Sequence, residues 1–227
     1  MRPLIWWLVL SGILIGSWVV RPVASQAATQ TTQSQIEVKI TPNEDDSAVK
    51  PVDPDDPSQP YPGDEADPGN VTGTGSRGFL TIDYLSNLAF NEITTTGGPV
   101  TTTAKNQKAM VQISDRRSTG SGWTLQVLPT APANNRQTLA ATIDLGSVEI
   151  KPATTNVSAP PQLINAGHLT VGSVNNVLKA DQQAGLGTWL LLMNRGSQPT
   201  TLHLNESRFS AGKYTGTLTW SLTNAPS

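Results

Sequence analysis

The sequence predicts an all-β protein, an antiparallel β-sandwich or a partly closed barrel, preceded by a disordered, acidic, Pro-rich linker. Nine short runs are β-branched or alternate apolar and polar residues, and Thr-, Gly- and Pro-rich connections separate them. No segment of eleven or more residues keeps a helical apolar period. Antiparallel sheets packed face to face bury patterns of this kind.

The predicted strands begin near residue 79. They are residues 79–84, 109–114, 122–128, 139–145, 148–151, 175–180, 189–193, 201–204 and 213–223. The last is the most regular, because its even-numbered positions from Leu218 to Leu222 are apolar and their neighbours are Thr or Ser. A slip of one residue would exchange its two faces, so we expect a fixed register.

Residues 111–128 are central to this pattern and predict a hairpin. Residues 111–114 and 123–128 alternate apolar and polar side chains, and the polar, Gly-rich residues 115–122 join them. Trp189 begins the unbroken apolar run WLLLM, which is typical of a strand buried on both faces, so we expect this Trp in the core.

Residues 1–27 have the features of a secretory signal peptide. Arg2 supplies a positive n-region, residues 4–20 an apolar h-region, and residues 24–27 (ASQA) a small-residue cleavage site. The alternative is a retained membrane anchor, for which the apolar run is slightly short of about 20 residues. The chain has no cysteine, which excludes disulfides and zinc–thiolate sites and suits an exported bacterial protein. No C-terminal sorting motif follows, so surface attachment would be non-covalent.

Residues 28–70 have the composition of a disordered, acidic, Pro-rich spacer, apart from one short strand-like run at residues 36–40 (IEVKI). Residues 41–70 hold nine acids against Lys50, a net charge of −8, and seven prolines. A segment so poor in apolar residues is expected to stay extended and solvated. Its Asp clusters lack the spacing of a calcium-binding EF-hand loop.

Residues 71–227 form the expected β domain and have the opposite charge. Eleven basic residues against seven acidic ones give a net charge of +4. This part is expected to attract polyanions weakly, although so small a charge is also ordinary for a domain of this length.

Two Trp-x-Leu triplets, Trp123–Leu125 and Trp220–Leu222, each lie in a period-2 run. The first triplet is preceded by an apolar strand, then Asp, Arg and small residues, with a Gly directly before Trp123. The second triplet lies in YTGTLTWSLTNAP. Over about residues 75–227 this arrangement resembles the WxL domain, a cell-wall-binding module of secreted Gram-positive surface proteins. The resemblance implies non-covalent wall binding in which both motifs take part.

The role of the motif residues has two interpretations. Trp123 and Trp220 share an apolar face with Leu125 and Leu222 respectively, which indicates core packing. Alternatively, one or both indoles line a groove in which a sugar ring stacks on the apolar face and the N–H group donates a hydrogen bond.

The residues before the first motif are also candidates for ligand binding. Asp115, Arg116 and Arg117 match the acid-and-Arg approach of the WxL pattern, and an Arg fork can hold a carboxylate or phosphate in a bidentate manner. The alternative is a local Asp115–Arg117 ion pair that fixes the loop.

Catalysis, metals and cofactors have no signal in this sequence. His168 and His203 lie without a metal-ligand spacing, so we expect no metal and no cofactor. The seven acids after residue 70 are scattered, and neither a Gly-x-Ser-x-Gly motif nor a catalytic Cys occurs. We therefore expect that the protein is not an enzyme.

Two functions remain. The first is a secreted, non-catalytic protein at the cell wall and cell surface that binds peptidoglycan through the WxL-like domain, with teichoic acid as a further candidate ligand. The second is a structural subunit of a surface complex, bound to other secreted or membrane-anchored proteins. Nucleic acid is not an expected partner, and the chain should not span the membrane after signal cleavage.

Overall fold

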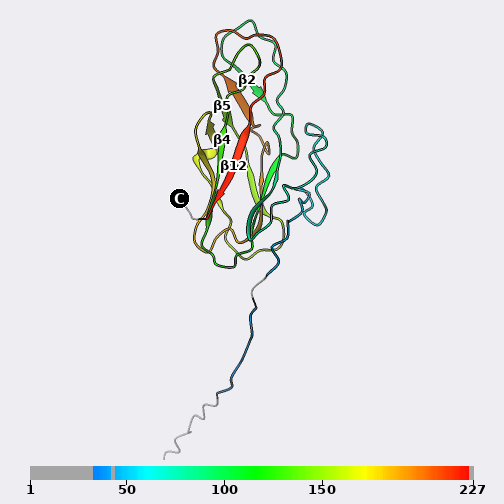
Figure 1. Ribbon diagram of the computed structural model, residues 1–227, viewed down its shortest axis with the longest axis vertical. Coiled ribbons are helices and arrows are strands. Elements are labelled where there is room, and N and C mark those ends of the chain that lie inside the picture. Colours follow the sequence, from blue (N-terminus) through cyan, green and yellow to red (C-terminus); the bar gives the residue numbers. More distant parts are fainter. Residues whose placement is uncertain (1–32, 42–43, 225–227) are drawn as a thin grey trace, which may run out of the picture. The chain divides into compact units, whose positions relative to one another are not determined.

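The computed structural model describes residues 33–41 and 44–224, and all its strands lie in one compact unit that spans Thr41–Ser227. The predicted signal peptide lies outside the described residues. No described helix is long and apolar enough to cross a membrane. The strands, several of them labelled in Figure 1, are β1 (Leu80–Leu85), β2 (Val100–Thr103), β3 (Met110–Asp115), β4 (Trp123–Pro129), β5 (Ala141–Asp144), β6 (Glu149–Pro152), β7 (Gln162–Leu163), β8 (His168–Thr170), β9 (Asn175–Ala180), β10 (Gly187–Leu192), β11 (Thr201–Leu204) and β12 (Leu218–Thr223), with a short 3₁₀ turn, η1 (Asn165–Gly167), before β8.

The strands form three antiparallel four-stranded sheets. Their orders are β1-β3-β10-β6, β2-β11-β5-β8 and β12-β4-β9-β7. The predicted all-β class is confirmed, as packed sheets without a closed barrel. Strands β2, β7 and β8 were not expected, because VTTT and two runs of two or three residues resemble the polar connections around them.

The core lies between the inner faces of all three sheets. Inner-face residues such as Ile113, Leu125 and Leu202 belong to one continuous buried cluster, although they come from different sheets. Trp189 is 3% exposed, which confirms its predicted place inside the protein. Its indole Nε1 donates a hydrogen bond to the Leu186 carbonyl at 2.9 Å, so the polar edge of the ring is satisfied.

The predicted hairpin at residues 111–128 is wrong. Strand β3 pairs with β1 and β10, whereas β4 pairs with β12 and β9, so residues 116–122 carry the chain from one sheet to another. The two strands alternate as expected. Local alternation, however, does not distinguish a hairpin from a connection between packed sheets.

The acidic segment, defined as residues 44–70, covers the outer face of the sheet β1-β3-β10-β6. Tyr61 is 5% exposed, and its ring centroid lies 4.7 Å from that of Tyr84 on β1. Val52 packs on the same outer cluster, which includes Met110, Leu190 and Leu192. The apolar run of β10 is therefore buried on both faces, as predicted, and the acidic segment is the second cover.

Polar contacts fix the acidic segment in register. The Val52 N–H donates to the side-chain Oε1 of Gln112 at 3.0 Å, and Gln112 Nε2 donates to the Lys50 carbonyl at 3.1 Å. Asp64 Oδ2 accepts hydrogen bonds from the backbone N–H groups of Gln107 and Lys108 at 2.9 and 2.6 Å. Each of these contacts joins the segment to the outer face of β3 or to the residues just before it.

The expected disordered spacer of residues 28–70 is thus contradicted for residues 44–70, and the compact unit begins at Thr41 rather than near residue 71. The physical reason is that Val52 and Tyr61 cover the apolar outer cluster, and ion pairs support them, because Lys108 pairs with Asp53 at 3.1 Å and Arg195 with Asp55 at 2.9 Å. The segment belongs to the folded unit, whose residues 41–227 hold sixteen acids against twelve bases, a net charge of −4. Attraction of polyanions by net charge is therefore not expected of this unit.

One buried acid predicts a dependence of stability on pH. Asp83 on β1 is 1% exposed, and burial raises the pKa of its carboxyl although Ser114, Thr81 and Gln112 donate hydrogen bonds to it. A raised pKa in the folded state means that this group favours folding below its unfolded pKa of about 4 and that the benefit is lost as pH rises through the folded pKa.

We expect D83N to gain stability relative to the parent chain as pH rises from 4 to 7. The free energy of unfolding of both chains, measured by urea denaturation at several pH values, tests this expectation. The same difference between the two chains at every pH would contradict it.

Candidate functional site

The two Trp-x-Leu motifs lie on neighbouring strands, β4 and β12 (Figure 1). In the antiparallel register Leu222 lies opposite Leu125, and Trp220 lies opposite Val127. Trp123 and Trp220 are therefore four residues apart along the pair, or about 14 Å at the usual rise of a strand. The motifs share one face through their leucines, but the two indoles do not meet.

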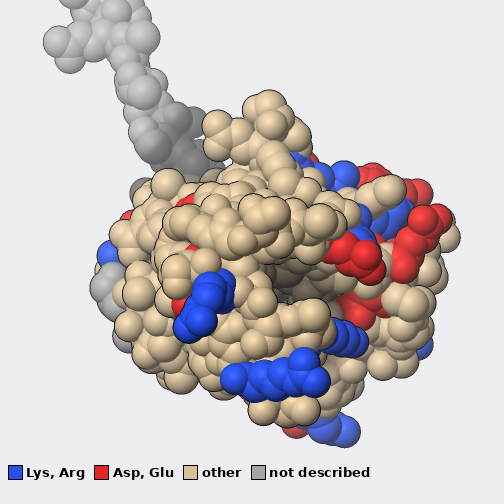
Figure 2. Space-filling model, turned by 90° about the horizontal axis from the view of Figure 1, so that it is seen from above, with Lys and Arg blue, Asp and Glu red and all other residues tan. Residues whose placement is uncertain are grey.

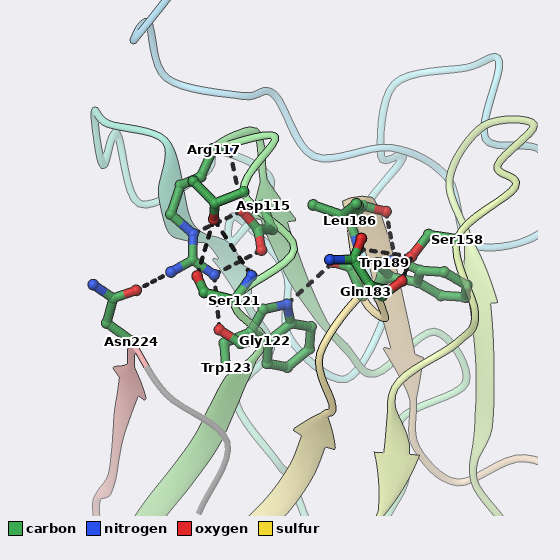
Figure 3. Close-up of polar contacts among 12 residues, drawn as sticks. Asp115, Arg117, Ser121, Gly122, Trp123, Ser158, Gln183, Leu186, Trp189 and Asn224 are labelled. Atoms are coloured by element: carbon green, nitrogen blue, oxygen red, sulfur yellow. Dashed lines mark hydrogen bonds and ion pairs between the residues drawn. The ribbon is translucent and has the colours of Figure 1, made fainter.

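Trp123 belongs entirely to the core. It is 0% exposed, and its Nε1 donates a hydrogen bond to the Gly185 carbonyl at 3.1 Å. Gly185 has φ +69°, and a Cβ at this position would lie 2.5 Å from Ala180 Cβ and 2.8 Å from Trp123 Nε1. The loop before β10 must therefore carry a glycine here so that its backbone can reach the indole. Figure 3 shows the Trp123 and Trp189 rings, each with its indole N–H bonded to this loop.

Trp220 differs because β12 is an edge strand. It is half-buried, as is Leu222, and both pack against the core cluster. The exposed side of Trp220 lines a groove of about 1380 Å³. Trp220 is therefore the motif tryptophan that a ligand can reach.

The groove lies between two segments that are far apart in the sequence. Residues 85–95, which start at the last residue of β1, form one wall, and residues 209–218, which end at the first residue of β12, form the other. Apolar side chains of the sheet β2-β11-β5-β8, including Leu202, Leu204 and Ile143, lie at its base. Figure 2 shows a hollow in this end of the molecule, with acidic side chains gathered on one flank.

The groove combines aromatic and polar groups. Phe90, Phe209 and Tyr214 line it together with Trp220, and Asn and Thr side chains of residues 87–95 accompany them. Its charged lining residues are Glu92, Lys105 and Lys213. Aromatic surface beside hydrogen-bonding groups suits an amphipathic polymer such as a glycan or a peptide.

Asp115 and Arg117 form an ion pair that ties the two motif strands together (Figure 3). Arg117 Nε and Nη2 donate to the two carboxylate oxygens of Asp115 at 2.9 and 2.7 Å, and Asp115 raises the pKa of the guanidinium. Arg117 Nη2 also donates to the Gly122 carbonyl at 2.8 Å, and Nη1 donates to the Asn224 side chain. The Arg117 guanidinium thus forms its hydrogen bonds within the protein, and it links the start of β4 to the end of β12.

Arg116 holds other segments. Its side-chain Nη2 donates to the carbonyls of Ser47 and Gly78 at 2.6 and 2.7 Å. Its backbone N–H donates to the Phe79 carbonyl at 2.6 Å. Of the seven predicted site residues, Trp220 alone lines the groove, whereas Leu125 and Leu222 lie opposite each other on the β4–β12 pair. The structure places Trp123 in the core and gives Asp115, Arg116 and Arg117 contacts within the fold.

The two histidines meet at one acid, which the sequence did not indicate. His168 Nδ1 lies 2.6 Å from Asp144 Oδ1, and His203 Nε2 lies 2.9 Å from Asp144 Oδ2. The pairing of β5 with β8 and β11 brings them together, and these long-range contacts carry no local sequence signal. The described part of the chain contains no group of three or more His, Cys, Asp or Glu that could hold a metal ion.

The comparisons with known proteins give one match. A family model described as WxL domain, surface cell wall-binding, matches residues 27–226. Searches of curated proteins and of solved structures find no match. The matched region includes the acidic segment, in agreement with its place in the folded unit.

Proposed function

We propose, from the premise that this chain belongs to the WxL family of surface cell wall-binding domains, that it is a secreted, non-catalytic protein that attaches non-covalently to peptidoglycan. The family establishes a cell-wall-binding protein at the cell surface. Secretion, peptidoglycan as the wall polymer and the contact residues are the parts that we propose beyond the family match.

Trp220 carries the proposal for the contact site. It is the motif tryptophan that lines the groove, and three further aromatic side chains line the same groove. A sugar ring or a stem peptide can stack on the indole, and the Asn and Thr side chains nearby can hydrogen-bond to the polymer. Trp123, Leu125 and the Asp115–Arg117 pair then hold β4 and β12 in place beneath this contact.

The groove supports binding rather than hydrolysis. Among its described lining residues Glu92 is the one acid, whereas glycoside hydrolysis uses two carboxylates about 5–10 Å apart. Lys105 and Lys213 offer local contacts for a carboxylate or a phosphate, so stem peptides and teichoic acid are both ligands to test. Binding through these lysines should weaken at high salt, because charges are screened within about 8 Å at physiological ionic strength.

Two conservative variants test the contact site. W220F should weaken co-sedimentation with purified peptidoglycan about 5–30-fold, equivalent to 1–2 kcal/mol, because the indole N–H and part of the stacking surface are lost. The matched control is W123F, which loses the hydrogen bond to Gly185 and should melt lower, yet bind normally at a temperature where it is folded.

Co-sedimentation is measured in parallel samples with and without teichoic acid, each at low and at high salt. These samples separate binding of the glycan from binding of charge. Unchanged binding by W220F with loss of binding by folded W123F would move the contact site away from the groove.

Secretion is tested by the mass of the mature chain. Signal cleavage after Ala27 should leave a protein that begins near Ala28 in the surface or culture fraction, as measured by intact-mass analysis. A membrane-bound chain that retains Met1 would support the anchor instead.

One observation favours the second candidate function, a structural subunit of a surface complex. β12 ends its sheet, so its outer edge is hydrogen-bonded to no strand among the described residues, and β1 lies near part of it. Open edges of this kind accept strands from other chains.

A further inference from the structure

We infer that the open edge of β12 pairs with residues 36–40 of a second copy of this chain, so that copies assemble head to tail. The inference deepens the second candidate function, the structural subunit, and does not depend on peptidoglycan binding. It follows from the hydrogen-bonding geometry of β12, the shape of the groove beside it and the pattern of the proposed occupant.

The geometry of β12 directs specific backbone groups outward. Thr130 N–H donates to the Thr217 carbonyl at 2.9 Å, and Thr215 and Ala133 exchange two backbone hydrogen bonds at 2.9 and 3.0 Å. Thr215 and Thr217, which lie directly before β12, therefore bond inward. Because bonding alternates along an antiparallel pair, the N–H and C=O groups of Leu218 and Trp220 point to the open edge.

The groove provides space beside the same edge. Residues 213–218 and Trp220 line it on one side, and residues 85–95 face them from the other. Side chains of Leu218 and Trp220 also reach the apolar base of the groove, where Leu202 and Leu204 lie. A strand that entered here would find backbone partners on its edge and an apolar surface beneath one of its faces.

Residues 36–40 have the pattern that such a strand needs. Ile36, Val38 and Ile40 alternate with Glu37 and Lys39, and these three apolar side chains are 95%, 76% and 84% exposed. They are among the most exposed large hydrophobic side chains of the described chain. Alternation of this kind fits a strand with one buried face, although no described strand pairs with this segment.

The two elements match in length and in charge. Residues 36–40 in a strand span about 14 Å, and the edge from Tyr214 to Trp220 spans about 20 Å, which is long enough to hold them. With the apolar side chains on the base of the groove, Glu37 and Lys39 would face solvent. Lys105, Lys213 and Glu92 line the groove and offer charges opposite to each of them.

The donor and the acceptor are different surfaces of one chain. Contacts between unlike surfaces generate open chains of copies or rings, whereas a like-with-like contact stops at a dimer. A copy whose groove is filled would not present Trp220 to the wall, but a copy at the end of such a chain would keep its groove open. Assembly can therefore be measured without any wall material, separately from peptidoglycan binding.

The test compares the chain that remains after signal cleavage with the variants V38D and V157D, and it uses a peptide of residues 33–41 as a third probe. Sedimentation velocity over a 100-fold range of concentration should show assembly of the parent chain. V38D should remain monomeric at concentrations at least ten times higher, because it places a charge on the buried face of the strand. The matched control V157D changes another valine, 104% exposed, and should assemble like the parent chain.

A labelled peptide of residues 33–41 provides the second measurement. It should bind V38D, whose groove is intact, and it should reduce assembly of the parent chain. Three results would each overturn the inference: a parent chain that stays monomeric, assembly that V38D does not alter, or a dilute monomer whose residues 36–40 are already protected from amide exchange.

Discussion

Removal of residues 28–70 should leave a chain that has lost most of its cooperative stability. The outer face of β1-β3-β10-β6 would be uncovered, which exposes Tyr84, Met110, Leu190 and Leu192. At about 1.5–3 kcal/mol for each large side chain, the loss is comparable with the 5–15 kcal/mol that stabilises a typical domain. Gln112 would also lose its two hydrogen bonds to the backbone of the acidic segment.

The matched control is removal of residues 28–40, which lie outside the compact unit. This shorter deletion should keep the melting temperature of the parent chain. The longer one should lower it by more than 10 °C, on the basis of about 2–4 °C per kcal/mol for a domain of this size, and should bind a hydrophobic dye. Thermal unfolding and amide exchange of β3 and β10 measure both effects. A stable fragment of residues 71–227 with protected β3 and β10 would show that the acidic segment only rests on the surface.

Two sequence signals together could have predicted this cover. The unbroken apolar run of β10 indicated burial on both faces, and the segments 41–70 and 71–227 carried opposite charges. The mean composition of residues 41–70 concealed a few well-spaced contact residues, above all Val52 and Tyr61. A mean composition describes solvation, whereas docking depends on which few side chains meet a surface.

Strand patterns were predictable where burial on one face dictated alternation. The strands that pair with β3 and β4 were not predictable, because pairing between strands far apart in the sequence depends on how the three sheets pack. The repeated Trp-x-Leu motif lies on β4 and β12, and their pairing is a finding of the structure that the sequence analysis did not predict. Alternation also placed both indoles on the inward face. Only the position of β12 at the edge of its sheet, which no local pattern reveals, leaves Trp220 open to a groove.

Replacement of Arg117 by methionine should lower the free energy of unfolding by about 3–5 kcal/mol. The Asp115 side chain is 0% exposed, so loss of the guanidinium would leave a buried carboxylate without its cation. The methionine keeps much of the apolar volume, so the effect would arise from charge rather than from a cavity. R136M is the matched control, since Arg136 is exposed in a loop, and it should change stability by less than about 0.5 kcal/mol.

The double variant D115N/R117M separates the two charges. Removal of both should cost clearly less than the sum of the single variants, because neither side chain is then left as an unpaired buried charge. Arg117 also contacts Gly122 and Asn224, so R117M should speed amide exchange at the end of β12 more than in β9. Urea denaturation and amide exchange measure these outcomes. Additive costs with uniform exchange would mean that Asp115 and Arg117 stabilise the fold separately and do not join the two motif strands.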